Sequence, residues 1–211
     1  MKFFSLENPI WKFIGNLADF FLLSCLWYLC CLPVVTAGAA TTALYYVTLK
    51  MARGQEGQLI PAFFHSFKQN LKQATALWVG YLAVGILLVL DLVICLQTSS
   101  VFAGAMFFTS VVLLACWALF ITMLFPLVAR CDNTTSALFK MGIAMALRNV
   151  MPVLAALMVT VAFFAVGVFV FWPLMLFSAG GIAFLHAKVL VWMIFPKYNW
   201  NESKEEQLWQ C

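Results

Sequence analysis

The sequence predicts an all-α fold, a polytopic bundle of transmembrane helices that forms one integral membrane domain over residues 1–211. Two features of composition support this: 65% of the 211 residues are hydrophobic and only 9% are charged, whereas soluble domains carry about 25% charged residues. The third observation is that long apolar segments recur along the chain, and roughly 20 helical residues cross a bilayer core of about 30 Å. We therefore expect a lipid bilayer around much of the chain and no room for a second, soluble domain.

The first apolar segment covers residues 14–32 and ends at a short break. Pro33 ends the helix because proline has no N–H to donate, and Thr36 is expected to cap the next helix. That helix, at about residues 37–51, opens with small residues such as Gly38, whose spacing of four lets helices approach closely in lipid. The segment is short for a full crossing, so it either crosses at a thin or kinked place or enters the membrane only part way.

A polar stretch follows, and it contains an amphipathic helix at about residues 60–73. The stretch opens with a turn at residues 53–57, and apolar side chains then recur at helical spacing. This pattern predicts a helix that lies in the membrane interface on the cytoplasmic side. We interpret the stripe of Phe63, Phe64 and Phe67 as a lipid-facing anchor or as a docking surface for a cytoplasmic partner.

The remaining apolar segments are expected at about residues 76–96, 105–128, 151–171 and 174–195. A second cytoplasmic helix, less cleanly amphipathic, is expected at about residues 132–149. A polar tail at 197–211 ends the chain.

The positions of lysine and arginine predict how the chain is oriented in the membrane, because cytoplasmic loops carry an excess of both residues. The basic residues gather in the two polar connections and in the tail, and the turns at 97–104 and 172–178 have none. Six crossings place the N-terminus, both connections and the C-terminus in the cytoplasm. Five crossings, the alternative, would leave Lys2 and Lys12 outside. We therefore expect a multi-pass protein of the cell membrane with both termini inside.

Several short motifs occur in a characteristic order: LPVVTAGA at residues 32–39, RGQEG at 53–57 and FHSFKQN at 64–70. In these motifs the chain resembles the YesL family, small integral membrane proteins of bacteria whose biochemical function is unknown. The resemblance implies a bacterial membrane protein whose genes often neighbour those for carbohydrate uptake and polysaccharide degradation. The family has no established catalytic residue, so the motifs supply only candidate functional positions: Arg53, Glu56, Phe64, Phe67, Lys68 and Asn70.

Two carboxylates and one lysine lie inside apolar segments, where a charge costs several kcal/mol unless it is paired. Asp19 in the first segment and Lys188 in the sixth are expected at similar depth, so they are candidates for an ion pair or for a role in coupling protons or solute. Asp91 is expected near the outer end of the third segment, close to water. We interpret His186 as a hydrogen-bonded packing group.

No residue pattern indicates catalysis or a cofactor. The chain has no nucleophile beside a base, and it has no carboxylate pair in a wet cleft. Metal binding is not expected from only two histidines, His65 and His186, and no basic patch is dense enough for nucleic acid. We therefore predict a non-enzymatic protein.

Two functional hypotheses remain. The first is an accessory or regulatory membrane protein that contacts a membrane or cytoplasmic partner of a sugar-uptake system through its cytoplasmic helices. The alternative is a small transporter or solute-binding membrane subunit for a sugar or related solute. A polar cavity reached by Asp19 or Lys188 would favour transport, and a closed apolar bundle would favour the accessory role.

Overall fold

The computed structural model describes residues 9–55, 57–98, 101–131, 133–169 and 175–198. In these ranges the protein is all-helical, as predicted, and no strand occurs. The elements are α1 (Pro9–Cys31), η1 (Val34–Thr36), α2 (Ala37–Ala52), α3 (Leu59–Gln97), α4 (Val101–Arg130), α5 (Thr135–Arg148), α6 (Val150–Phe169), α7 (Met175–Val189), η3 (Leu190–Ile194) and η4 (Phe195–Tyr198).

Four helical stretches of the described chain are long and apolar enough to cross a membrane. They are Leu59–Gln97, Phe102–Arg130, Val150–Phe169 and Met175–Lys197, and Gly15–Cys31 is a shorter apolar helix. The membrane-protein prediction thus holds in its coarse form. Length and hydropathy identify four candidate spans rather than the six crossings predicted, because α2 has only 16 residues and the stretch Gly15–Cys31 of α1 is also shorter than a span.

The predicted interfacial helix and the third apolar segment are one helix, which corrects the expected division at residues 73–76. Helix α3 has 39 residues, so it is about 58 Å long, roughly twice the thickness of a bilayer core. Residues 69–77 contain neither proline nor glycine, and nothing in them stops a helix. The polar half of α3 therefore continues directly into its apolar half.

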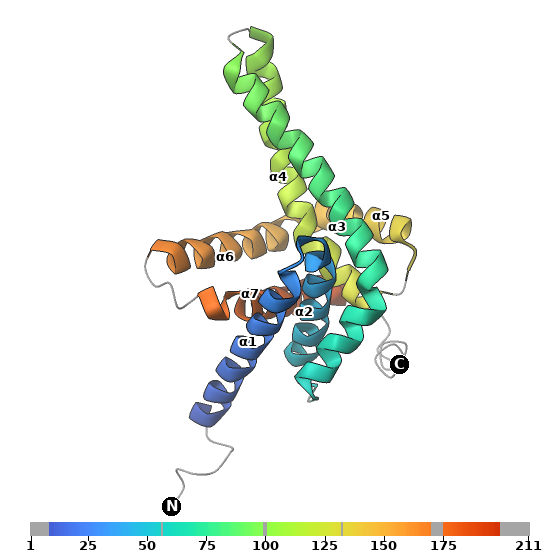
Figure 1. The fold of residues 1–211 in the computed structure, drawn as a ribbon, viewed down its shortest axis with the longest axis vertical. Helices are drawn as coiled ribbons and strands as arrows, with labels where there is room; N and C mark the ends of the chain where they lie inside the picture. Colours follow the sequence, from blue (N-terminus) through green and yellow to red (C-terminus); the bar gives the residue numbers. More distant parts are fainter. Residues whose placement is uncertain (1–8, 56, 99–100, 132, 170–174, 199–211) are drawn as a thin grey trace, which may run out of the picture.

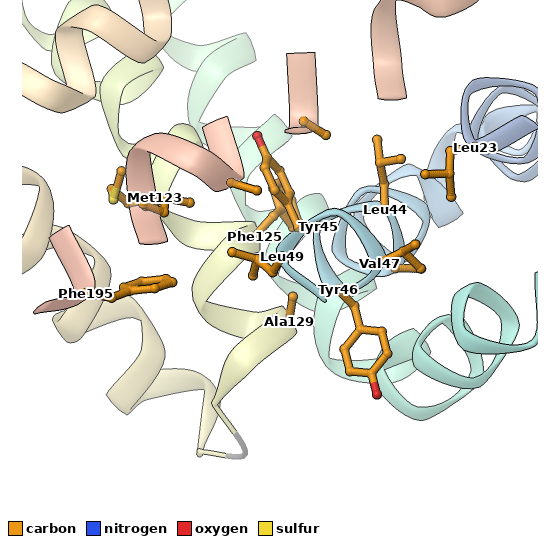
Figure 2. Packing of buried hydrophobic residues seen from close by; sticks show 14 of the residues in the cluster. Leu23, Leu44, Tyr45, Tyr46, Val47, Leu49, Met123, Phe125, Ala129 and Phe195 are labelled. Carbon is orange, nitrogen blue, oxygen red and sulfur yellow. The ribbon is translucent and has the colours of Figure 1, made fainter. Parts of the chain in front are cut away.

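Helix α2 lies at the centre of the fold, packed against α1, α3, α4 and α7. Nearly all of it is buried, and small residues allow the close packing that the sequence predicts. A Cβ added to Gly38 would lie 2.5 Å from Trp78 Cβ and 2.6 Å from the Ala74 carbonyl oxygen on α3. Figure 2 shows Tyr45 and Leu49 of α2 close to Phe125 of α4, within one cluster of buried side chains.

The break at Pro33 forms the turn of the α1–α2 hairpin, but Thr36 does not cap α2 as expected. Its hydroxyl donates instead to the carbonyl oxygens of Cys30 at 2.6 Å and Pro33 at 2.8 Å. The short 3-10 helix η1 places Thr36 in a helical conformation, whereas an N-cap side chain needs an extended backbone to reach the helix amides. Thr36 therefore closes the turn onto the end of α1.

The apolar ends of α3 and α4 form a hairpin that extends well beyond the rest of the protein (Figure 1). Tyr81 and Trp117 stack at the base of this hairpin with ring centroids 4.0 Å apart. Beyond them, large apolar side chains are exposed on both helices, among them Ile86, Leu87 and Phe108. This exposed apolar surface fits a lipid environment.

Helix α6 runs across the direction of the α3–α4 hairpin rather than along it (Figure 1). The apolar helices of the protein therefore do not all run parallel to one another. Segment length indicates which helices fit a bilayer, but crossing angles depend on how the ridges of one helix pack into the grooves of another.

Candidate functional site

Asp19 and Lys188 lie on two helices that pack together, but no ion pair joins them in the described part of the chain. Helices α1 and α7 meet through Phe20 and Phe184, whose ring centroids are 5.0 Å apart. Lys188 is exposed, and its Nζ lies 4.9 Å from the centroid of the Phe184 ring. Asp19 is half-buried. The predicted pairing is therefore not observed.

The rotation of α7 about its own axis explains why Asp19 and Lys188 do not form an ion pair. The buried residues of α7, Ala183, His186 and Ala187, recur at spacings of three and four, and Leu190 at the start of η3 continues the same pattern. Lys188 is two positions from His186, which turns it toward the outside. Its side chain follows the surface over an aromatic ring, as long basic side chains commonly do.

His186 is instead the polar centre of the helical core. Its Nδ1 lies 2.9 Å from the Tyr45 hydroxyl, and its Nε2 lies 2.7 Å from the Ala156 carbonyl oxygen and 2.9 Å from Thr160 Oγ1. A carbonyl only accepts, so we assign the proton to Nε2, and Nδ1 then accepts from Tyr45. The interpretation of His186 as a hydrogen-bonded packing group is confirmed.

This network joins three helices, because Tyr45 belongs to α2, His186 to α7, and Ala156 and Thr160 to α6. The sequence did not reveal these partners. The available signal was the pair of alanines at 183 and 187, one turn apart on the same face as His186, which marks a close helix contact.

Asp91 has a partner that the sequence did not indicate. The Ser110 hydroxyl of α4 donates to the Asp91 carboxylate of α3 within the projecting hairpin. Asp91 is half-buried and Ser110 is buried. The pair joins the two helices of the hairpin through a polar contact, which is the usual arrangement for an ionisable group in an apolar segment.

The phenylalanine stripe of α3 faces mainly inward, which corrects its interpretation as an outer anchor or docking surface. Phe63 is fully buried, Phe67 packs against the core, and only Phe64 is exposed, at 37%. Asn70 is also buried, and its amide donates to the Ser66 carbonyl oxygen at 3.1 Å. The polar half of α3 thus presents Lys68 and its neighbours outward.

The turn after α2 is tight, as predicted. Gly54 has φ +71°, a left-handed conformation that glycine adopts without strain, and its N–H donates to the Met51 carbonyl oxygen. Arg53 is the C-cap residue of α2. Glu56, the other charged candidate in this motif, lies outside the described residues.

Several helix ends meet near Arg130. Its guanidinium, at the end of α4, lies 3.9 Å from the centroid of the Phe195 ring. Lys197 Nζ donates to Asn149 Oδ1 over 3.4 Å, at the junction of α5 and α6. The sequence analysis singled out none of these residues as a candidate site.

The fold and these polar contacts define an all-helical protein with helices long and apolar enough to span a membrane. The family model described as "Protein of unknown function, DUF624" matches residues 20–92, which include about half of α1, all of η1 and α2, and most of α3. No curated protein and no solved structure matches the chain. The match contains the central helix and the turns on both sides of it.

Proposed function

We propose that the protein is a non-enzymatic accessory or regulatory protein of the bacterial cell membrane, of the YesL type, that assists a carbohydrate-uptake system. The continuous cluster of buried apolar side chains around α2 is the observation that supports this proposal. Leu23, Leu44, Val47 and Leu49 are almost completely buried in one continuous cluster. Asp19 and Lys188, the charges that would serve an internal solute path, lie at the margin of this cluster or outside it.

Two surfaces are suited to a partner. The polar half of α3 exposes Lys68 and Lys72, and α5 exposes Phe139, Ile143 and Leu147 opposite its buried face. A charged helix and a neighbouring amphipathic helix provide both electrostatic steering and apolar contact area. The sequence predicts that both lie on the cytoplasmic side.

Site-specific photo-crosslinking tests the proposal. A photoreactive amino acid is placed at Lys68, at Leu147 and, as a lipid-facing control, at Phe108 in the projecting hairpin. Cells are irradiated during growth on a sugar whose uptake genes neighbour the gene for this protein. We expect one sugar-uptake subunit to be crosslinked from Lys68 or Leu147 and not from Phe108. Crosslinking to lipid alone from all three positions, with the protein folded, would contradict the accessory role.

The alternative is transport of a sugar or related solute, and Asp19 is the observation that favours it. A carboxylate in an apolar helix is expensive unless it has a use. Uptake into proteoliposomes that is lost with Asp19→Asn, at unchanged thermal stability, would support transport. Absence of uptake of every sugar tested would leave the accessory role as the better explanation.

A further inference from the structure

The turn between α1 and α2 lies beside the middle of α3, far from the turn that joins α3 to α4. Trp78 Nε1 donates to the Val34 carbonyl oxygen over 2.8 Å. Gly38, near the start of α2, packs against Ala74 and Trp78. Between Trp78 and Gln97, α3 rises by about 28 Å, which is close to the bilayer core of about 30 Å. The α1–α2 turn therefore stops about one membrane thickness short of the far end of α3.

The side chains of α3 indicate which direction in the protein corresponds to the membrane normal. The first half of the helix exposes Lys68 and Lys72, whereas residues 74–90 contain no charged side chain. If α3 lay along the membrane plane, both lysines would be exposed at the same depth as the apolar half, which is costly. The axis of α3 therefore points across the membrane, and the change from polar to apolar residues near Gln73 lies at the interface on the side of the lysines.

Exposed apolar side chains from two other segments lie at this same level. Figure 1 shows the α1–α2 turn and α6 at the base of the projecting α3–α4 hairpin. Helix α6 packs against α4 and α7, and α7 lies on the side of α6 that is away from the hairpin tip. The uncovered face of α6 therefore points to the same side as the hairpin. We name the most exposed of these side chains the basal apolar surface: Leu32, Val34, Val35, Met151, Met158 and Phe169.

We propose that the basal apolar surface rests among the upper acyl chains of the cytoplasmic leaflet. The α1–α2 turn then does not reach the outer face of the membrane, and α6 lies along the membrane rather than across it. The lysines on the polar half of α3 place the base of the hairpin on the cytoplasmic side. Trp78, which joins the turn to α3, has the position that is typical of an aromatic anchor at a membrane interface.

The direction of α6 supports this arrangement. Helix α6 is long and apolar enough to cross a membrane, but it runs across the direction of the hairpin (Figure 1). The two therefore cannot both cross one bilayer, and the gradient of polarity along α3 selects the hairpin. A helix that lies in the membrane plane buries its apolar face about 5–10 Å into the boundary between headgroups and acyl chains.

Depth-dependent fluorescence quenching tests the proposal. In the full chain without native cysteines, a bimane probe is attached to Val34→Cys, Met151→Cys, Met158→Cys or Phe169→Cys. Each protein is reconstituted into vesicles of phosphatidylcholine and phosphatidylglycerol that carry bromine either near the headgroup or near the ends of the acyl chains. We expect the shallow bromines to quench every probe about twofold more than the deep ones. The three α6 positions should give equal depths, whereas a crossing helix would place Met158 deepest.

The matched controls lie on α3, where Leu87 and Lys68 are both exposed. A probe at Leu87→Cys should be quenched more by the deep bromines, and a probe at Lys68→Cys should be quenched by neither lipid. In intact cells, a membrane-impermeant maleimide should label Thr98→Cys and leave Val34→Cys unlabelled. Labelling of Val34→Cys from outside, absence of quenching at the α6 positions, or deepest quenching at Met158 would overturn the proposal. Melting curves show that each labelled variant is folded.

Discussion

At the scale of single residues, the most consequential side chain is His186. It is buried, and it contacts a tyrosine hydroxyl, a threonine hydroxyl and a backbone carbonyl on two other helices. Hydrogen bonds between membrane helices contribute on average about 0.6 kcal/mol each and at most about 1.7. The network therefore contributes measurably to helix association, and its geometry specifies how α2, α6 and α7 meet.

His186→Ala should lower the free energy of unfolding by about 2 kcal/mol, because it removes these bonds and leaves a small cavity. The measurement is thermal unfolding of the protein in mild detergent, with an expected drop of about 5 °C. His65→Ala is the control, since His65 is exposed on α3. Equal melting temperatures for the two variants would show that the network does not stabilise the core.

The Asp91–Ser110 pair gives a second prediction at this scale. Ser110→Ala should cost about 1–2 kcal/mol, because the half-buried carboxylate loses its hydroxyl donor. Asp91→Leu/Ser110→Ala should be close to neutral, because no polar group is then left unsatisfied. Thr109→Ala is the neighbouring control, since the Thr109 hydroxyl donates to the Ala105 carbonyl oxygen of its own helix. Denaturant unfolding measures the free energy of unfolding of the two Ser110 variants and of Thr109→Ala. A double variant that is less stable than Ser110→Ala would contradict this explanation.

At the scale of elements, close contacts at glycines determine how the helices pack. Gly38 brings α2 against α3, and Gly180 brings α7 against α1, where an added Cβ would lie 2.5 Å from the Phe20 carbonyl oxygen. Both contacts involve backbone atoms of the neighbouring helix, which cannot move aside as a flexible side chain can. The helices would have to separate to admit a methyl group.

Gly38→Ala and Gly180→Ala should therefore each destabilise the protein by about 1–3 kcal/mol. Gly80→Ala should stabilise it by up to about 1 kcal/mol, because Gly80 has open space around its Cα and alanine is the better helix former. Melting temperatures of the three variants test this difference in sign. Stabilisation by Gly38→Ala would contradict the close packing of α2 on α3.

At the scale of the whole molecule, the continuity of α3 constrains where the membrane lies. A helix of about 58 Å cannot be contained within a core of about 30 Å. Its first half exposes Lys68 and Lys72, whereas its second half exposes mainly apolar side chains. The second half therefore fits a lipid environment, and the first half fits water on the side that the sequence predicts to be cytoplasmic.

Cysteine labelling in a background without native cysteines tests this arrangement. A membrane-impermeant maleimide should label Thr98→Cys in intact cells, because Thr98 ends α3 at the expected outer turn. Lys68→Cys and Lys140→Cys should react only after the cells are permeabilised. Labelling of Lys68→Cys in intact cells would reverse the orientation, and protection of all three positions would contradict the exposure of these helix ends.

The amino-acid composition alone identifies the class of the protein, because the balance of apolar and charged residues already requires lipid as the solvent. Apart from the division of α3, the sequence also predicted the approximate positions of the helices, the tight turn at Gly54 and the close approach at Gly38, since these depend on local residue types. The orientation of each side chain around its helix axis, and therefore its partners, became known only from the tertiary structure. It turned Phe63 and His186 inward and Lys188 outward, and it paired Asp91 with Ser110. One step of a helix rotates a side chain by about 100°, so a spacing that identifies a helix does not identify the neighbour that each face will meet.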